Sequence, residues 1–266
     1  MTSPFLKWAG GKRWLASSNL LPIPERFRRY VEPFLGGAAV FFQLSPTQSI
    51  LSDINAELIN LYRVIRDDPK ALEALMIEHQ AKHSRDHYYA VRADVPTGNI
   101  AQAARTLYLN RTCWNGLYRV NLRGEFNVPI GTKTTVIMEE ENFLSLSDAL
   151  QGAEILCQDF EETLALVEEG DFVFIDPPYT VKHNMNGFLK YNEKIFSWAD
   201  QIRLHDAVVA AATRGASIVV TNADHESVRE LYSDFTYKKL GRVSVLAGDP
   251  GKRGKTSEAM FLANLD

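Results

Sequence analysis

Short apolar runs that alternate with helical patterns constrain the fold of this chain more than any other feature. Five runs have the length and composition of buried parallel strands. They are Tyr30–Pro33, Ser49–Ser52, Glu154–Cys157, Phe172–Ile175 and Ser217–Thr221. Helical patterns lie between many of them, at about 37–44, 55–66, 159–168 and 197–213. This alternation predicts an α/β fold with a doubly wound sheet, which binds its ligands at the carboxyl ends of the strands.

Residues 56–145 interrupt the alternation. We find no convincing sheet strand there, and the pattern instead predicts helices at 55–66, 69–81, 85–93 and 99–113. In the turn-rich patch that follows, Asn115-Gly116 and Arg123-Gly124 flank alternating apolar and polar residues, as in a β-hairpin. We therefore expect a mainly helical insertion carrying a hairpin, within an α/β domain formed by residues 1–55 and 146–266. Two later runs, 235–238 and 259–262, are expected to form a second hairpin.

Composition places the chain among ordinary globular proteins. Its 266 residues are 45% hydrophobic and 23% charged, which suits one large domain or a domain with a smaller insertion. We find neither an apolar run near the roughly 18 residues of a membrane span nor a secretory signal, so we expect a cytoplasmic protein without membrane contact. Cys113 and Cys157 have no metal-ligand spacing and form no disulfide framework, which favours a reducing compartment and predicts no bound metal.

Basic residues cluster in residues 7–30, 105–133 and 238–255, although the net charge is −4. If these three segments meet in space, they form a phosphate-binding face on an acidic body. The alternative interpretation is ordinary solvated surface.

A glycine-containing turn follows the first predicted strand. Gly36-Gly37 is followed by Ala38-Ala39, so the turn lacks the spacing of both the nicotinamide-dinucleotide fingerprint and the P-loop. The second strand ends in Asp53, which is placed to accept hydrogen bonds from the two hydroxyls of a ribose. The alternative role for Asp53 is N-cap of the helix that begins near Asn55. Together, the glycine-containing turn and Asp53 favour a nucleoside ligand that needs no phosphate-binding loop. S-adenosylmethionine (AdoMet) is such a ligand, because it has a ribose and an adenine but no phosphate.

The fourth strand ends in Asp176-Pro177-Pro178-Tyr179, where two prolines prevent the strand from continuing. An exocyclic amino group is a poor nucleophile because its lone pair is delocalised into the base. The Asp176 carboxylate and a backbone carbonyl, best that of Pro177, accept from its two N–H bonds and stabilise the developing charge. Tyr179 offers a flat face on which a flipped-out base can stack. The alternative is a Pro-Pro strand stop with a capping Asp.

These motifs stand in an order that resembles the Dam-type (D12 class, α group) DNA adenine-N6 methyltransferases. The resemblance covers nearly the whole chain. It includes "FLKWAGGK" at 5–12, "VEPFLGGAAVFF" at 31–42, "LSDIN" at 51–55, "NGLYRVNLRGEFNVPIG" at 115–131, "FIDPPY" at 174–179, "YNEKIFSWADQIRL" at 191–204, "TNAD" at 221–224 and "RGKTSEAMF" at 253–261. It implies a Rossmann-like AdoMet-dependent methyltransferase sheet, in which the insertion at 56–145 is the target-recognition domain.

The resemblance also implies roles for individual residues. AdoMet contacts are expected from Trp8, Lys12, Phe34, Gly36, Gly37, Asp53, Asp159, Phe160 and Asp176. The target adenine and the transferring methyl are expected at Asp176, Pro177, Pro178 and Tyr179. DNA contacts are expected from Tyr118, Arg119, Asn121, Arg123, Asn127 and Pro129. Within this set, Arg123 corresponds to the arginine that reads guanine in relatives specific for GATC, in keeping with a bidentate contact to guanine O6 and N7.

The expected function is direct methyl transfer from AdoMet to N6 of an adenine flipped out of double-stranded DNA, most simply in GATC. No metal, covalent enzyme intermediate or obligate protein partner is implied. One segment departs from the family pattern. Ile130-Gly131 leads into Thr132-Lys133-Thr134-Thr135 where some relatives have a basic aromatic run, so contacts to flanking phosphates are expected to differ.

Three alternatives remain open from the sequence. Related motifs serve methylation of cytosine N4, RNA adenine or glutamine, although the Asp at the first motif position leans toward adenine. A DNA-binding regulator that has lost activity would keep the hairpin but transfer no methyl group. A nicotinamide-dependent oxidoreductase is the weakest alternative, because its glycine fingerprint is missing.

Overall fold

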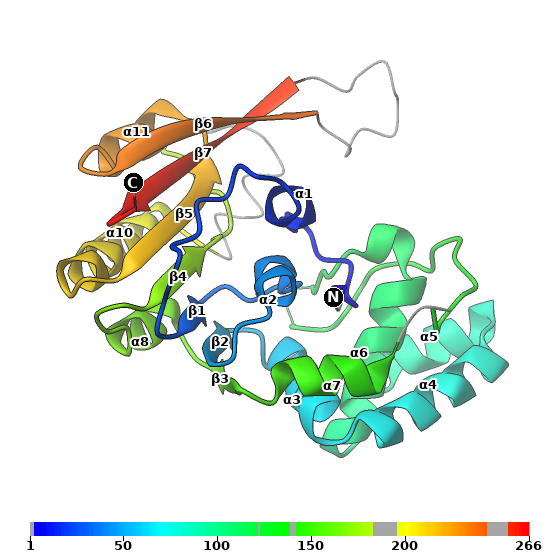
Figure 1. Ribbon diagram of the computed structural model, residues 1–266. Coiled ribbons are helices and arrows are strands. Elements are labelled where there is room, and N and C mark those ends of the chain that lie inside the picture. The colour runs from blue at the N-terminus through cyan, green and yellow to red at the C-terminus, as the bar shows by residue number, and fades with distance from the viewer. Residues whose placement is uncertain (1–2, 122, 139–141, 183–195, 244–254, 266) are drawn as a thin grey trace. The chain divides into compact units, whose positions relative to one another are not determined.

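The computed structural model describes residues 3–121, 123–138, 142–182, 196–243 and 255–265 (Figure 1). It is a mixed α/β structure with seven strands among the described residues. The chain divides into two compact units. Unit 1 comprises residues 1–21 and 35–158, and unit 2 comprises residues 22–34 and 159–266. The expected α/β class is therefore confirmed, and each unit is described by itself.

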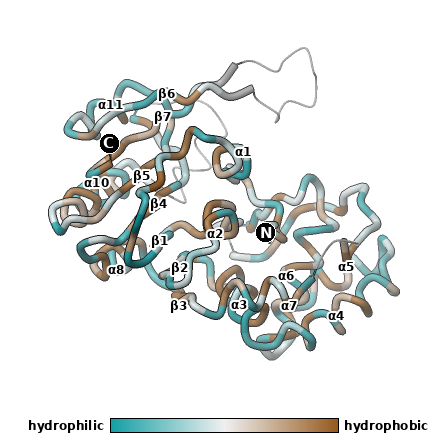
Figure 2. Tube along the Cα trace, viewed as in Figure 1, coloured by the Kyte–Doolittle hydropathy of each residue, from teal (hydrophilic) through white to brown (hydrophobic). Residues whose placement is uncertain are grey.

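The described residues of unit 2 contain five strands. Parallel neighbours β1 (Tyr30–Glu32), β4 (Phe172–Ile175) and β5 (Ser217–Ala223) pair in sequence, with Tyr30 opposite Phe172 and Phe172 opposite Ser217. Antiparallel β7 (Lys255–Ala263) pairs with β5 and with β6 (Thr236–Val243), which confirms the predicted C-terminal hairpin. All four residues of β4 are buried. The apolar residues of this unit follow β4 and β5 in Figure 2.

Three described helices belong to unit 2. They are α8 (Phe160–Ala165), α10 (Trp198–Thr213) and α11 (Glu226–Leu231). The N-terminus of α10 is fixed by a capping box, in which Ser197 accepts from the Asp200 backbone N–H and Asp200 accepts from the Ser197 backbone N–H. The predicted helices at 159–168 and 197–213 are confirmed, whereas α11 was not expected. The quoted segments at 191–204 and 253–261 begin outside the described residues.

Unit 1 contains the parallel pair β2 (Ser49–Asp53) and β3 (Ala153–Cys157), with Asp53 opposite Cys157. Its first helices are α1 (Arg13–Ala16), α2 (Ala39–Leu44) and α3 (Ala56–Asp67). Asn55 is the N-cap of helix α3, and its side chain accepts from the Leu58 backbone N–H. This cap fixes where β2 ends and α3 begins.

The rest of unit 1 is mainly helical. It contains α4 (Pro69–Lys82), α5 (Arg85–Ala93), α6 (Asn99–Thr112), the short η1 (Trp114–Gly116) and α7 (Phe143–Leu150). We call these helices the helical cluster. Every residue of α6 from Ala103 to Thr112 is buried, so α6 lies at the centre of this cluster. In the part of 56–145 that the structure describes, strand-like pairing is limited to the isolated bridges Cys113–Ile130 and Val120–Phe126. The predicted recognition domain at 56–145 lies within unit 1 and stays a prediction as a separate domain.

No helix among the described residues has both the length and the apolar character needed to cross a membrane.

Candidate active site

The glycine turn, residues 35–38, lies directly before α2 in unit 1. Gly36 has a φ of +45°, and a Cβ atom at this position would lie 2.8 Å from Cδ1 of Trp8. The left-handed backbone favours glycine here, and any side chain would force the Trp8 ring to shift. The backbone N–H of Gly36 donates a 3.1 Å hydrogen bond to Oδ2 of Asp53. The structure thus brings together Trp8, Gly36, Gly37 and Asp53, four of the residues expected to bind AdoMet.

Asp53 fixes the end of β2. Its Oδ1 accepts from the Asn55 backbone N–H at 3.0 Å, while Asn55 itself caps α3. The alternative in which Asp53 is the helix N-cap is therefore wrong. Burial raises the pKa of Asp53, and hydrogen bonds from backbone N–H groups oppose that rise. Because each carboxylate oxygen has two lone pairs, Asp53 retains acceptor capacity for ligand hydroxyls.

Lys12 lies on the same N-terminal segment as Trp8. Only 3% of Lys12 is exposed, and its Nζ donates to the Gly10 carbonyl oxygen at 3.0 Å. An ammonium group held this way is a fixed positive charge near the start of α1. Because Lys12 is buried, it is not part of an exposed phosphate-binding surface. The contact between Lys12 and AdoMet stays a prediction.

A hairpin, residues 113–131, carries the residues expected to contact DNA. Its two arms are joined by backbone hydrogen bonds from Asn121 N to Glu125 O at 2.9 Å and from Asn127 N to Arg119 O at 3.1 Å. Arg119 Nε donates to Asn127 Oδ1 at 2.7 Å, which ties the arms together. The predicted hairpin is therefore present, although its pairing is limited to isolated bridges. Leu122 lies outside the described residues.

At the tip of this hairpin, Asn121 shapes the turn. Its Oδ1 accepts from the backbone N–H groups of Arg123 and Glu125, at 2.9 and 3.1 Å. Its Nδ2 donates to the Glu125 carboxylate at 2.8 Å. Arg123 is exposed beside this turn, and Pro129 accepts from the Trp114 backbone N–H at the base of the returning arm. Asn121 therefore presents Arg123 while its own polar atoms are engaged.

Tyr118 is directed toward the body of unit 1. Its ring stacks on Trp8 with centroids 5.4 Å apart, and its hydroxyl donates to the Glu57 carboxylate at 3.0 Å. Burial and the nearby Glu57 carboxylate raise the pKa of Tyr118 well above its ordinary value. The phenol therefore stays protonated and donates the hydrogen bond.

Residues 176–179 follow β4, and we call them the Asp176 corner of unit 2. The neighbouring strand β5 holds this corner in place. The Thr221 hydroxyl on β5 donates a 2.7 Å hydrogen bond to Oδ1 of Asp176, directly after β4. Thr221 itself is fully buried. A threonine at this position fixes one oxygen of the carboxylate, so the corner is preorganised before any ligand arrives.

Tyr179 is anchored by the antiparallel strand β7. Its hydroxyl donates to Oε2 of Glu258 on β7 at 2.9 Å. Burial, Asp176 and Glu258 all raise the pKa of Tyr179 well above its ordinary value. The ring is thereby held in one orientation by a neutral phenol.

Two buried amide side chains, those of Gln201 and Asn222, support the Pro177-Pro178 segment. Nε2 of Gln201 on α10 lies 3.5 Å from the Pro178 carbonyl oxygen, and Oε1 of Gln201 accepts from Asn222 Nδ2 at 3.0 Å. Both amide side chains are fully buried. Sequence reasoning missed these supporting residues and also Thr221 and Glu258. The signal was present in "YNEKIFSWADQIRL", "TNAD" and "RGKTSEAMF", which follow the family pattern but in which these residues carried no assigned role.

Three aromatic rings form a second cluster in unit 2. Phe34 stacks on Phe160 at 5.4 Å and meets Phe196 edge-on at 5.7 Å. The guanidinium of Arg203 lies 4.9 Å from the Phe160 centroid. Arg203 also donates to the carboxylates of Asp159, Glu161 and Asp200, and these three acids raise its pKa. The structure thus brings Phe34, Asp159 and Phe160 together, while Arg203 was not anticipated.

Several basic residues of the three basic segments are engaged within their own units. Arg105 and Arg111 are only 4% and 5% exposed, and Arg105 donates to three backbone carbonyls. Arg28 and Arg29 both pair with the buried carboxylate of Asp171. The phosphate-binding face predicted from charge alone is therefore wrong for these residues. Lys252 and Arg253 lie outside the described residues.

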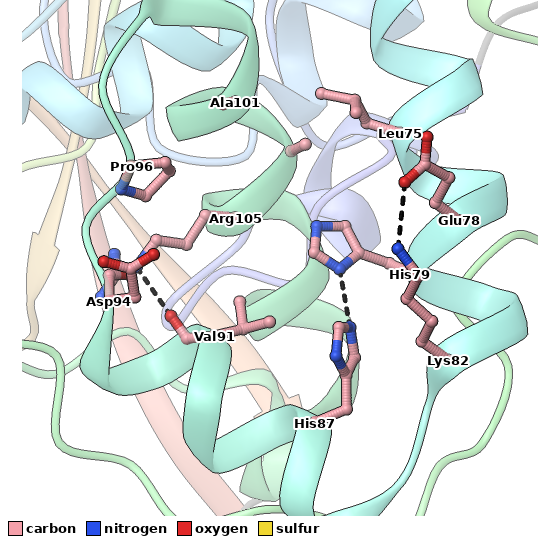
Figure 3. Close-up of a pocket in the computed structure, with 11 residues that line it drawn as sticks. Leu75, Glu78, His79, Lys82, His87, Val91, Asp94, Pro96, Ala101 and Arg105 are labelled. Atoms are coloured by element: carbon pink, nitrogen blue, oxygen red, sulfur yellow. Dashed lines mark hydrogen bonds and ion pairs between the residues drawn. The ribbon is translucent and has the colours of Figure 1, made fainter.

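A cavity of about 200 Å³ lies among α4, α5 and α6 (Figure 3). It is lined in part by His79 and His87, whose Nδ1 and Nε2 atoms lie 3.0 Å apart. None of the residues expected to bind AdoMet or DNA lines this cavity. Within unit 1, the cavity belongs to these helices, and its lining includes no residue of the glycine turn.

Comparison with known proteins gives consistent family relationships. The model of the D12 class N6 adenine-specific DNA methyltransferases matches residues 8–246. The type II methyltransferase M1.LlaDCHI of Lactococcus lactis subsp. cremoris is 36% identical over 264 residues, covering 96% of this chain and 93% of that protein. The type II methyltransferase M.MjaIII of Methanocaldococcus jannaschii is 35% identical, with 94% and 96% covered. A DNA adenine methylase of Serratia marcescens is 34% identical, with 97% of each chain covered.

Proposed function

This chain belongs to the D12 class of N6 adenine-specific DNA methyltransferases, and we propose that it methylates N6 of an adenine flipped out of duplex DNA, within GATC. The family is AdoMet-dependent and acts on adenine in DNA. The observation that carries the proposal is the Asp176 corner. Its carboxylate is held by Thr221 at 2.7 Å and its aromatic ring by Glu258 at 2.9 Å.

Asp176 accepts a hydrogen bond from the target amino group in the proposed mechanism. Each carboxylate oxygen has two lone pairs, so Asp176 accommodates both the Thr221 hydroxyl and one N–H of the adenine. The second N–H donates to the Pro177 carbonyl. These two acceptors draw the nitrogen toward tetrahedral geometry and stabilise the positive charge that develops on it. Asp176 acts as an acceptor and not as a strong base, because the amino proton becomes acidic only after methylation.

Tyr179 supplies the stacking face for the flipped base. A base outside the helix has lost the stacking of its neighbours, and an aromatic ring restores part of that energy. The hydrogen bond to Glu258 fixes the ring before the base arrives, so little orientation entropy remains to be lost. Pro178 sets the bend while Gln201 holds its carbonyl.

The AdoMet contacts are proposed from each unit separately. In unit 1, Gly36 and Gly37 offer backbone without side chains, and Asp53 accepts from ribose hydroxyls. Trp8 covers the glycines and Lys12 adds a fixed charge. In unit 2, Asp159 and Phe160 serve the adenine of the cofactor, and Phe34 serves its methionine side. When bound, AdoMet supplies an electrophilic methyl group on a sulfonium, so these residues need only bind and orient it.

DNA recognition is proposed for the hairpin tip. Arg123 is exposed there, and its guanidinium has the geometry for a bidentate contact to guanine O6 and N7. Arg119, Asn121, Asn127 and Pro129 hold the two arms and the turn in shape while contributing contacts to the duplex.

Sequencing that detects N6-methyladenine, on plasmid from a host expressing the chain, tests base and site together. We expect methylation of the adenine in GATC and no modified cytosine. Methylation confined to a different motif would show that the Arg123 assignment is wrong. Modified cytosine, or binding of GATC duplex with no methyl transfer, would contradict the proposed reaction.

Asp176→Ala tests the chemistry. The variant is expected to retain AdoMet binding, weakened by no more than the loss of one contact, but to lose at least about 100-fold in kcat, as for removal of one preorganised transition-state contact. Near wild-type turnover with AdoMet bound would refute the role of Asp176. Asp206→Ala, an exposed acid on α10 of the same unit, serves as the matched control.

A further inference from the structure

Tyr118 links two parts of unit 1 to which separate roles are proposed. It lies in the hairpin, yet its ring stacks on Trp8 at a centroid distance of 5.4 Å and an interplanar angle of 25°. Trp8 in turn lies against the glycine turn, 2.8 Å from where a Gly36 Cβ would be and 3.3 Å from where a Gly37 Cβ would be. One aromatic pair therefore connects the hairpin to the glycine turn.

A second path connects the same two parts. The Tyr118 hydroxyl donates to Glu57 in the first turn of α3 at 3.0 Å. The N-cap of α3 is Asn55, whose backbone N–H donates to Asp53 at 3.0 Å. Asp53 accepts from Gly36 at 3.1 Å. The contacts form a closed ring that runs from the glycine turn through Trp8, Tyr118, α3 and Asp53 back to the glycine turn.

Both ends of Tyr118 are held firmly. Glu57 lies 3.5 Å from Arg105, whose buried guanidinium is anchored by the backbone carbonyls of Val91, Arg92 and Asp94. On the hairpin side, the Tyr118 ring meets Phe126 of the returning arm at 5.9 Å. A displacement of Trp8 is therefore transmitted to both arms of the hairpin rather than absorbed by a loose side chain.

We propose that Tyr118 is a positioning residue through which AdoMet binding at the glycine turn and DNA recognition by the hairpin strengthen each other. A ligand at the glycine turn restricts Trp8, and Trp8 restricts Tyr118 and the hairpin. The duplex then binds a hairpin that is already ordered, so DNA binding loses less conformational entropy. By linkage, the cognate duplex increases AdoMet affinity by the same factor. This inference rests on the proposed function, because AdoMet and the cognate duplex are its two ligands.

The test measures the dissociation constant of AdoMet by calorimetry, with and without a saturating duplex that contains the methylated site found by sequencing. The ratio of the two constants is the coupling. We expect a ratio of about 5 or more in the wild type, at the lower end of usual coupling energies. Tyr118→Leu is expected to reduce the ratio to about 1 while leaving AdoMet affinity without DNA within about 2-fold.

Three further variants sharpen the test. Tyr118→Phe keeps the stacked ring and loses the Glu57 hydrogen bond, so it should retain most of the coupling. Tyr118→Met fills more of the space than Leu, guards against loss of folding and should also abolish the coupling. Tyr89→Leu removes a partly exposed tyrosine from α5 of the same unit, outside the ring of contacts, and should keep the wild-type ratio.

A wild-type ratio of 1, or an unchanged ratio in Tyr118→Leu, overturns the inference while the methylation assay still supports the proposed function. Equal loss of coupling in Tyr89→Leu also overturns it, because the effect would then reflect general loosening of the unit. A wild-type chain that binds duplex but transfers no methyl group overturns the proposed function and this inference with it.

Discussion

The hydroxyl of Thr221 lies 2.7 Å from a carboxylate oxygen of Asp176, although the two residues are 45 positions apart in the chain. This contact crosses from β5 to β4 because the two strands are parallel neighbours, with Ile175 opposite Val220. Parallel pairing places the residue after each of these positions at the same edge of the sheet. Strand β5 thus contributes a hydrogen-bond donor to the Asp176 corner.

Thr221→Val removes this donor and preserves the shape of the side chain. A hydrogen bond to a charged group contributes about 1.5–3 kcal/mol, so we expect kcat to fall by about 10- to 100-fold. The dissociation constant of AdoMet should change little. Single-turnover methylation assays measure the first quantity and calorimetry the second. Thr221→Ser keeps the hydroxyl and should retain most of the activity; equal loss in both variants would show that the hydroxyl is not responsible.

Glu258→Leu removes the acceptor that orients Tyr179. We expect kcat/KM to fall by about 3- to 10-fold, since loss of one hydrogen bond corresponds to about 1 kcal/mol. Thermal unfolding should shift down by about 2–4 °C. Glu258→Gln retains an acceptor oxygen and should lie close to the wild type. If Gln is as defective as Leu, the negative charge and not the hydrogen bond is what Tyr179 requires.

Gly36→Ala places a methyl group against the Trp8 ring, 2.8 Å from its Cδ1 atom. The left-handed backbone adds strain of about 1–2 kcal/mol. We expect AdoMet affinity to fall by at least about 10-fold, measured by calorimetry. Gly98→Ala imposes similar backbone strain, with a φ of +90°, but its Cβ meets nothing within 4 Å. Comparable loss of affinity in Gly98→Ala would mean that destabilisation, and not the clash with Trp8, is the cause.

The helical cluster of unit 1 should lose stability in acid. Burial lowers the pKa of His79 to about 4, and its neighbours include His87 on α5, Glu78 and Lys82 on α4, and Tyr108 on α6. Because the unfolded chain binds the proton first, the stabilising contribution of neutral His79 is complete above its ordinary pKa of 6.5. It is lost as the pH falls from 6.5 toward 4.

Urea unfolding at several pH values between 4 and 7 measures this loss. His79→Phe keeps an aromatic ring against Tyr108 and cannot be protonated. We expect its free energy of unfolding to depend less steeply on pH over this range. A slope identical to that of the wild type would assign the acid sensitivity to other groups.

Local signals predicted much of the fold. Phe172–Ile175 was predicted with its observed bounds because four consecutive apolar residues end at two prolines. Residues 85–93 were predicted as a helix with its observed bounds, and Ser84 provides the capping signal. Helices α1 and α11 were missed because they are only four and six residues long and depend on packing. Helix α7 was missed as well, although Asn142 caps it.

The candidate site was predictable where its chemistry lies in contiguous motifs. Asp176, Gly36 and Asp53 stand at strand ends, and strand ends are visible in the sequence. The supporting contacts were not predictable, because they join distant positions such as Tyr179 and Glu258, which are 79 residues apart. The inward direction of Tyr118 was also hidden, since alternation along a hairpin gives two faces without saying which one Trp8 covers.

The N-terminal segment around Lys7 and Trp8 cannot dock until a long stretch of the chain after it has been synthesised. The Lys7 backbone donates to Oδ1 of Asn110 at 3.1 Å and accepts from Nδ2 of the same residue at 2.8 Å. The partners are 103 positions apart, so the segment emerges from the ribosome long before Asn110 does. At usual elongation rates this interval is roughly 5 to 20 seconds. During it Trp8 and its neighbours have no docking surface on the hairpin, and a nascent-chain chaperone has that interval in which to bind them.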